Sequence, residues 1–145
     1  MSSKGKPVKG QTASKTAQAP NRSAERQSQL EFELDFFEGI LNRNPDYVDV
    51  LRVYGNNLTL KGRFADGLKI DRRLVGLRPK DALAHYNLAC SLSLLNKIEP
   101  ALRALRKAIE LGYRDFRYLR EDRDLAAVRK DPRFRQLLRE FEKAV

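Results

Sequence analysis

The 145-residue sequence is poor in the residue types that most often carry chemistry: it contains one cysteine, one histidine, one methionine and no tryptophan. The single cysteine, Cys90, excludes an internal disulfide, which suits a reducing compartment. A metal site would have to rest on carboxylates alone, because only one histidine and one cysteine are present. The sequence also lacks a glycine-rich phosphate loop and a nucleophile elbow. We therefore predict a protein that is not an enzyme and that binds no metal and no other cofactor.

Long hydrophobic runs are missing as well. No stretch approaches the roughly 18 apolar residues of a membrane-spanning helix. The first 20 residues lack the apolar core of a secretory signal. Their Lys- and Ser-rich composition is similar to that of an organellar transit peptide, but the Leu, Phe and Arg of an amphipathic helix are missing. We predict a cytoplasmic protein without membrane insertion.

Acidic residues are scarce near the N-terminus. Residues 1–28 carry six Lys and Arg side chains against Glu25 alone, so this fifth of the chain holds about half of the net charge of +10. Residues 1–25 contain a single Val and, beyond the first methionine, no other large aliphatic or aromatic side chain. This is too little apolar surface to offset the entropy lost on ordering. We predict that residues 1–27 form a disordered basic tail and that order begins near Ser28, a candidate helix N-cap.

What the sequence does contain is an internal repeat of 34 residues. This interval separates pairs of identical or similar residues: Pro45 and Pro79, Leu58 and Leu92, Leu60 and Leu94, Leu68 and Leu102, Leu77 and Leu111, Gly55 and Ala89, and Gly67 and Ala101. A period between about 20 and 50 residues is typical of solenoids, in which each unit buries its apolar face against the next unit.

Within each period the apolar residues recur at intervals of three and four residues, which is the spacing of an amphipathic helix. Turns of only a few residues separate these stretches, so neighbouring helices should form antiparallel hairpins. Gly112 indicates a left-handed C-cap. The predicted helices cover residues 28–44, 46–60, 63–76, 81–95 and 98–111, with a last helix that follows an Asp131 cap and has Pro132 in its first turn.

The residues at the repeated positions resemble the tetratricopeptide repeat. They are Leu51, Tyr54, Gly55, Leu58, Gly67, Asp71, Leu74 and Pro79 in one copy, and His85, Leu88, Ala89, Leu92, Ala101, Leu105 and Ala108 in the next. The resemblance covers about residues 30–138 and implies an all-α fold of antiparallel helical hairpins stacked as a short right-handed solenoid. The implied parts are the tail 1–27 and a repeat domain 28–145, made of a half repeat 28–45, repeats 46–79 and 80–113, and a C-terminal helical cap 114–145.

Three residues of this pattern invite a chemical interpretation. Asp71 stands where the family favours an aromatic residue, which suggests a looser interface or a salt bridge with a nearby arginine. His85 stands where tryptophan is favoured, and we expect it to pack as an aromatic substitute rather than to act as a base or ligand. Cys90 lies among small residues, and we expect a small buried hydrophobe rather than a nucleophile.

The resemblance also implies a concave groove lined by the first helix of each hairpin. Four polar residues in that register look like the carboxylate clamp of tetratricopeptide domains that bind the acidic C-terminal tails of heat-shock chaperones. Cations would neutralise a terminal carboxylate there, and amides would orient it. The pattern departs from the clamp at Glu121, where a cation is expected, so an ordinary polar groove is the alternative. With an adjacent tyrosine, the predicted peptide-binding residues are Arg52, Asn56, Tyr86, Asn87 and Arg117.

We predict a non-catalytic protein–protein interaction module that binds a partner peptide or helix in its groove, with an acidic or carboxylate-ending ligand as the specific hypothesis. The alternative is an adaptor that binds nucleic acid or another polyanion weakly through the basic tail, without sequence preference. Two and a half repeats leave their end faces poorly covered, so a monomer and a weak homo-oligomer both remain open.

Overall fold

The computed structural model describes residues 21–143, and every regular element within that range is helical. The predicted tail as far as residue 20 lies outside the described residues. The elements are α1 (Arg22–Arg43), α2 (Val48–Leu60), α3 (Phe64–Leu77), α4 (Ala82–Leu94), α5 (Ile98–Glu110), α6 (Phe116–Glu121), the 3₁₀ helix η1 (Arg123–Leu125), α7 (Ala126–Arg129) and α8 (Pro132–Glu142). The all-α prediction is confirmed.

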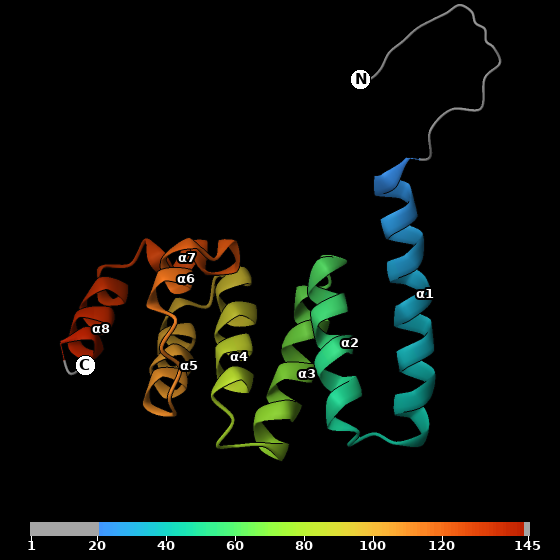
Figure 1. The fold of residues 1–145 in the computed structure, drawn as a ribbon, viewed down its shortest axis with the longest axis horizontal. Coiled ribbons are helices and arrows are strands. Elements are labelled where there is room, and N and C mark those ends of the chain that lie inside the picture. Colours follow the sequence, from blue (N-terminus) through green and yellow to red (C-terminus); the bar gives the residue numbers. More distant parts are fainter. Residues whose placement is uncertain (1–20, 144–145) are drawn as a thin grey trace, which may run out of the picture.

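The helices follow one another in chain order as a row of hairpins (Figure 1). Helices α2 and α3 form one hairpin, α4 and α5 form the next, and the short elements α6 and α7 lie beside the end of the second hairpin. The turns inside the two hairpins share one backbone feature, a residue with positive φ. Gly62 has φ of 86° and Asn96 has φ of 59°, and the two residues are one period apart. Glycine and asparagine are the residues that tolerate a positive φ best, so both copies reverse direction in the same way.

Small residues allow α2 and α3 to cross closely. A Cβ atom on Gly55 would lie 3.1 Å from Ile70 Cγ2, and one on Gly67 would lie 3.2 Å from Thr59 Oγ1. One period later the same positions are Ala89 and Ala101, and neither exposes any surface. The predicted role of the small repeated residues in helix packing is therefore confirmed.

The start of the ordered region differs from the prediction. Helix α1 begins at Arg22, because the Asn21 side chain accepts hydrogen bonds from the backbone N–H groups of Ser23 and Ala24, at 3.0 and 3.2 Å. Ser28, the expected N-cap, lies inside the helix. Residues 22–27 thus belong to α1 rather than to a disordered tail, and the expectation for them is wrong.

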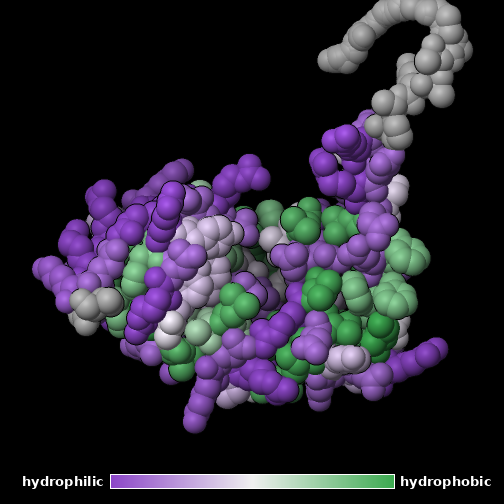
Figure 2. Space-filling model, in the orientation of Figure 1, coloured by the Kyte–Doolittle hydropathy of each residue, from purple (hydrophilic) through white to green (hydrophobic). Residues whose placement is uncertain are grey.

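The C-terminal helices lie at one end of the stack. The largest core joins α4 and α5 to the last elements, and eight of its residues have no exposed surface, among them Leu105, Leu119, Leu125 and Val128. The final helix has the predicted start, with the Asp131 side chain accepting from the Arg133 N–H and Pro132 in the first turn. The other end of the stack is apolar instead: Phe32 and Phe36 on α1 are 64% and 54% exposed, and Figure 2 shows hydrophobic residues along the outer edge of this helix.

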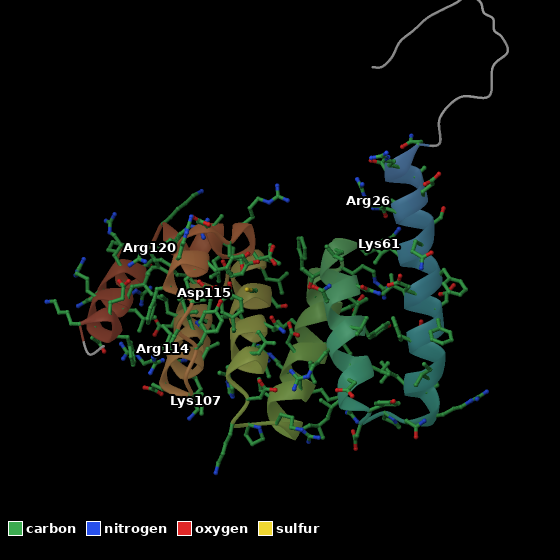
Figure 3. The ribbon with its side chains drawn as sticks, in the orientation of Figure 1. Arg26, Lys61, Lys107, Arg114, Asp115 and Arg120 are labelled. Atoms are coloured by element: carbon green, nitrogen blue, oxygen red, sulfur yellow. The ribbon has the colours of Figure 1, made fainter. Side chains whose placement is uncertain are left out.

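Exposed ion pairs connect neighbouring elements across the surface. Lys61 at the end of α2 reaches Glu31 of α1, with 3.3 Å between Nζ and Oε2, and Arg120 of α6 pairs with Glu142 of α8 (Figure 3). Such exposed pairs contribute little to stability, so burial of the leucines and alanines holds the stack together. Among residues 21–143, no helix has both the length and the apolar content required to cross a bilayer.

Candidate functional site

The candidate site is a groove of about 270 Å³ on the face that the first helices of the hairpins share. Helix α2 forms one wall, α4 forms the floor, and the segment from Tyr113 through α6 to η1 forms the other wall. The lining residues are Gly55, Asn56, Thr59, Asp71, Leu83, Tyr86, Asn87, Cys90, Ser91, Tyr113, Tyr118, Asp122 and Asp124. We refer to this surface as the tyrosine groove.

Three of the five predicted peptide-binding residues line the tyrosine groove. Asn56 is exposed on α2, while Tyr86 is buried and Asn87 half-buried on α4. These three residues come from two repeats and lie around one cavity, as the repeat register implied. The side-chain amides of Asn56 and Asn87 offer donors and acceptors to a ligand backbone.

The two predicted arginines lie outside the lining. Arg52 is half-buried and pairs with the carboxylate of Asp81, the residue that caps α4. Arg117 projects from α6 with 89% of its side chain exposed, and its nearest carboxylate is Glu121, at 3.7 Å between Nε and Oε2. The structure therefore does not bring these arginines together with Asn56 and Asn87 in one cavity.

The charge of the groove comes from carboxyl groups. Asp71, Asp122 and Asp124 all contribute to its lining, and within residues 21–143 no Lys or Arg belongs to that lining. Asp122 is 8% exposed and holds the wall together: it accepts from the Tyr86 hydroxyl and from the backbone N–H of Asp124, at 2.9 Å. A ligand that carries a carboxylate would therefore be repelled by the groove lining rather than neutralised by it.

Asp71 does not form the salt bridge that its position suggested. Its carboxyl group is 6% exposed and accepts a hydrogen bond from the Ser91 hydroxyl of α4. Burial raises the pKa of Asp71 to about 6, although the hydrogen bond from Ser91 acts in the opposite direction. At pH 7 this carboxyl group is therefore still mostly ionised, and a nearby cation would stabilise its charged form.

Tyrosines supply the rest of the groove wall. The rings of Tyr86 and Tyr113 stack with 4.5 Å between centroids and an interplanar angle of 11°, and the Tyr118 ring lies 6.3 Å from Tyr86. Tyr118 is 49% exposed, so part of its ring is accessible. The negative charge of Asp122 is the main cause of the raised pKa of Tyr118. Aromatic rings and carboxyl groups thus share one negatively polarised surface.

The two residues with the most reactive side-chain types have structural roles. Cys90 is 7% exposed, and burial together with the nearby Asp122 raises the pKa of its thiol, so the thiolate is disfavoured. His85 is half-buried, and its Nε2 donates to the carbonyl oxygen of Pro79 at 2.8 Å. Within residues 21–143, no group of three or more His, Cys, Asp or Glu side chains is arranged to hold a metal ion.

The sequence interpretation missed the far wall of the groove. Tyr113 is the last residue of the last clear repeat, and Tyr118, Asp122 and Asp124 follow it, where the period fades. Helix α6 takes the place of the first helix of a third hairpin. Because first helices line the groove, this position could have indicated that residues of α6 belong to the groove wall. The carboxylates could not be predicted in the same way, because the bend after α6 carries them.

The period, the hairpins and the shared groove define a fold of the tetratricopeptide repeat type. Solved structures agree with this class: the chain is similar to MamA, a tetratricopeptide repeat protein, solved as "MamA 41-end from Desulfovibrio magneticus RS-1", with a TM-score of 0.59. That match has 19% sequence identity and covers 85% of this chain and 72% of the MamA chain. The structure "MamA RS-1 ArsTM double mutant" matches with the same TM-score and identity, and 71% of its chain is covered. At this identity the likeness concerns the fold alone.

One curated protein is similar in sequence. Over 93 residues the chain is 33% identical to a protein of Arabidopsis thaliana whose name describes it as chloroplastic, a match that covers 62% of this chain. The matched region spans only 28% of the Arabidopsis protein, well under two thirds of its length. No family model matches the chain.

Proposed function

We propose that this chain is a non-catalytic interaction module that binds an extended peptide or a helix of a partner protein in the tyrosine groove. The observation that carries this proposal is the placement of Asn56, Tyr86 and Asn87 from two repeats around one open cavity. Proteins of the tetratricopeptide type are typical scaffolds for protein–protein contacts, and groove amides suit the recognition of a peptide backbone.

An acidic or carboxylate-ending ligand is the alternative partner for this module. Arg117 supports it, because this side chain is exposed and pairs only at long range with Glu121. Against it stand the pairing of Arg52 with Asp81 and the carboxyl groups of the groove lining. A ligand of this kind would have to bind beside the groove rather than in it.

The test is a quantitative affinity capture with three forms of the tagged chain. The first is wild type, the second is Asn56→Ala with Asn87→Ala, and the third is Asn42→Ala, a matched asparagine exposed on α1. We expect partners that the double variant loses and that both other forms retain. Identical partner sets for all three forms would contradict the groove as the binding surface. A fourth form, Arg117→Glu, tests the acidic ligand: partners lost with this form alone would favour it.

The basic N-terminal segment supports a second candidate function, the binding of a polyanion. Six Lys and Arg side chains within residues 1–28, against one acid, would release counterions from nucleic acid without reading its sequence. We expect fluorescence anisotropy with a labelled single-stranded RNA to detect binding that weakens steeply with salt. The polyanion role fails if deletion of residues 1–20 leaves that affinity unchanged.

The proposed location is the cytoplasm, with the chloroplast as the competing location. The name of the Arabidopsis relative supports the competitor, as does the scarcity of acids in residues 1–28. A fluorescent protein fused behind residues 1–27 and expressed in plant protoplasts separates the two. Fluorescence confined to chloroplasts would refute the cytoplasmic proposal.

A further inference from the structure

The tyrosine groove is negatively charged, and none of the described residues that line it is a cation. Three carboxyl groups belong to its lining, and Asp122 and Asp124 lie on the same wall, where the Asp124 N–H donates to Asp122 at 2.9 Å. Burial first and the charge of Asp122 second raise the pKa of Asp124. A carboxyl group whose charged form is disfavoured by burial and by a neighbouring carboxylate gains most from a positive ligand.

The same wall presents an aromatic surface to the cavity. Tyr113 stacks on Tyr86, and Tyr118 stands at the edge with 49% of its surface exposed. A Lys or Arg cation within about 6 Å of a tyrosine ring is attracted by the negative face of the ring. The hydroxyl of Tyr86 is committed to Asp122 and the residue is only 4% exposed, so Tyr113 and Tyr118 supply the accessible aromatic surface.

The size of the groove suits a single long side chain. Its volume is about 270 Å³. An extended aliphatic stem can lie along Leu83, which is 49% exposed at the rim, while the charged end reaches the carboxyl groups. This combination of an exposed leucine, tyrosine rings and carboxyl groups in one lining matches the chemistry of lysine and arginine.

We propose that the tyrosine groove recognises a lysine or arginine side chain of the partner, with Tyr118 and Tyr113 contacting its cation and Asp122 and Asp124 neutralising its charge. This inference rests on the proposed function, because it takes the groove to be the partner-binding surface. It names the chemistry of the partner: a basic peptide segment rather than an acidic one.

The test uses the full chain and an array of random dodecapeptides in four sets, each with a fixed central lysine, arginine, glutamate or norleucine. We expect binding to the lysine and arginine sets, and at least about tenfold weaker binding to norleucine, which keeps the stem and lacks the charge. Asp124→Asn should weaken binding of the best basic peptides by a similar factor, and Tyr118→Ala by about two- to fivefold. Tyr47→Ala is the matched control, because Tyr47 is also 49% exposed and lies on no groove wall.

The outcomes separate this inference from the proposed function. Peptides whose binding needs Asn56 and Asn87 but shows no preference for a basic residue would overturn the inference and leave the groove as the binding surface. A preference for glutamate would also overturn it. A preference for lysine or arginine that survives Asp124→Asn and Tyr118→Ala would place the basic site elsewhere and overturn it too. Binding that ignores Asn56→Ala with Asn87→Ala in every set would instead defeat the proposed function.

Discussion

The hydrogen bond between Tyr86 and Asp122 links α4 to the segment after α6, and its removal should measurably destabilise the protein. Both groups are buried, at 4% and 8% exposure, and the Tyr86 hydroxyl donates to the Asp122 carboxylate. A hydrogen bond to a charged group contributes about 1.5–3 kcal/mol. We therefore expect Tyr86→Phe to lower the free energy of unfolding by about 2 kcal/mol.

Asp122→Ala should cost more, because it removes the bond to Tyr86, the cap of η1 and a weak contact from the Cys90 thiol. The cap of η1 is the hydrogen bond that the Asp124 N–H donates to Asp122, at 2.9 Å. A lost cap costs about 0.5–2 kcal/mol, which gives a total of about 2–5 kcal/mol. The contact from Arg129 to the Asp122 carbonyl oxygen, at 2.6 Å, is to the backbone and should survive. Small domains are stable by about 5–15 kcal/mol, so both variants should still fold.

The assay is urea unfolding followed by far-UV circular dichroism, on wild type, both single variants and the double variant. Because the two residues interact directly, the double-variant cycle should give a coupling energy of about 1–3 kcal/mol. Tyr47→Phe, at an exposed tyrosine, is the control and should change stability by less than about 0.5 kcal/mol. Additive single effects, with a coupling energy below about 0.5 kcal/mol, would refute the reasoning that this bond joins α4 to the segment after α6.

Three further perturbations test other parts of the fold. Leu105→Ala should cost about 2–5 kcal/mol in the same urea assay, because this side chain has no exposed surface. The pKa of Asp71 is raised from 3.8 to about 6, so the folded state becomes less stable as pH rises and this carboxyl group ionises. Between about pH 4 and 7 the free energy of unfolding of the wild type should fall by about 2–3 kcal/mol relative to that of Asp71→Asn. Parallel pH profiles of the two proteins would contradict this. Asn21→Ala should remove the cap of α1 and accelerate amide hydrogen exchange over residues 22–27, with a cost of about 1 kcal/mol, whereas unchanged exchange would show that the cap is unnecessary.

The repeat allowed most of the helical architecture to be predicted from the sequence. Four predicted helices, over 46–60, 63–76, 81–95 and 98–111, agree with α2 to α5 within about two residues. The reason is physical: each helix buries one apolar stripe, and that stripe is written in the spacing of the leucines.

The start of α1 could not be found by the same signal. Its first buried residue is Leu30, so the apolar spacing begins a full two turns after the helix does. The residues before Leu30 are exposed, and the Asn21 cap stabilises the helix end instead of packing. A polar N-terminal extension of a helix resembles a disordered tail in composition, and only the cap distinguishes the two.

The sequence did not determine which charged and polar side chains pair with one another in the site. Arg52 and Asn56 share a helix face, as predicted, yet Arg52 pairs with Asp81 across 29 residues of chain. Asp122 meets Tyr86 across 36 residues. Such partners depend on how two hairpins are placed relative to each other, whereas helix periodicity only orders residues within one helix.

The positions where successive repeats differ explain why this groove has its own chemistry. One period apart, Asp71 corresponds to Leu105: the second copy fills the position with a fully buried leucine, while the first places a carboxyl group in the groove lining. Arg52 corresponds in the same way to Tyr86, so one copy uses the position for an ion pair and the other for a groove wall. Residues that keep the period are needed for stacking and cannot vary without cost. The groove that we propose as the binding surface therefore takes its chemistry mainly from residues that break the period, and under that proposal its aspartates and tyrosines would determine which partner it accepts.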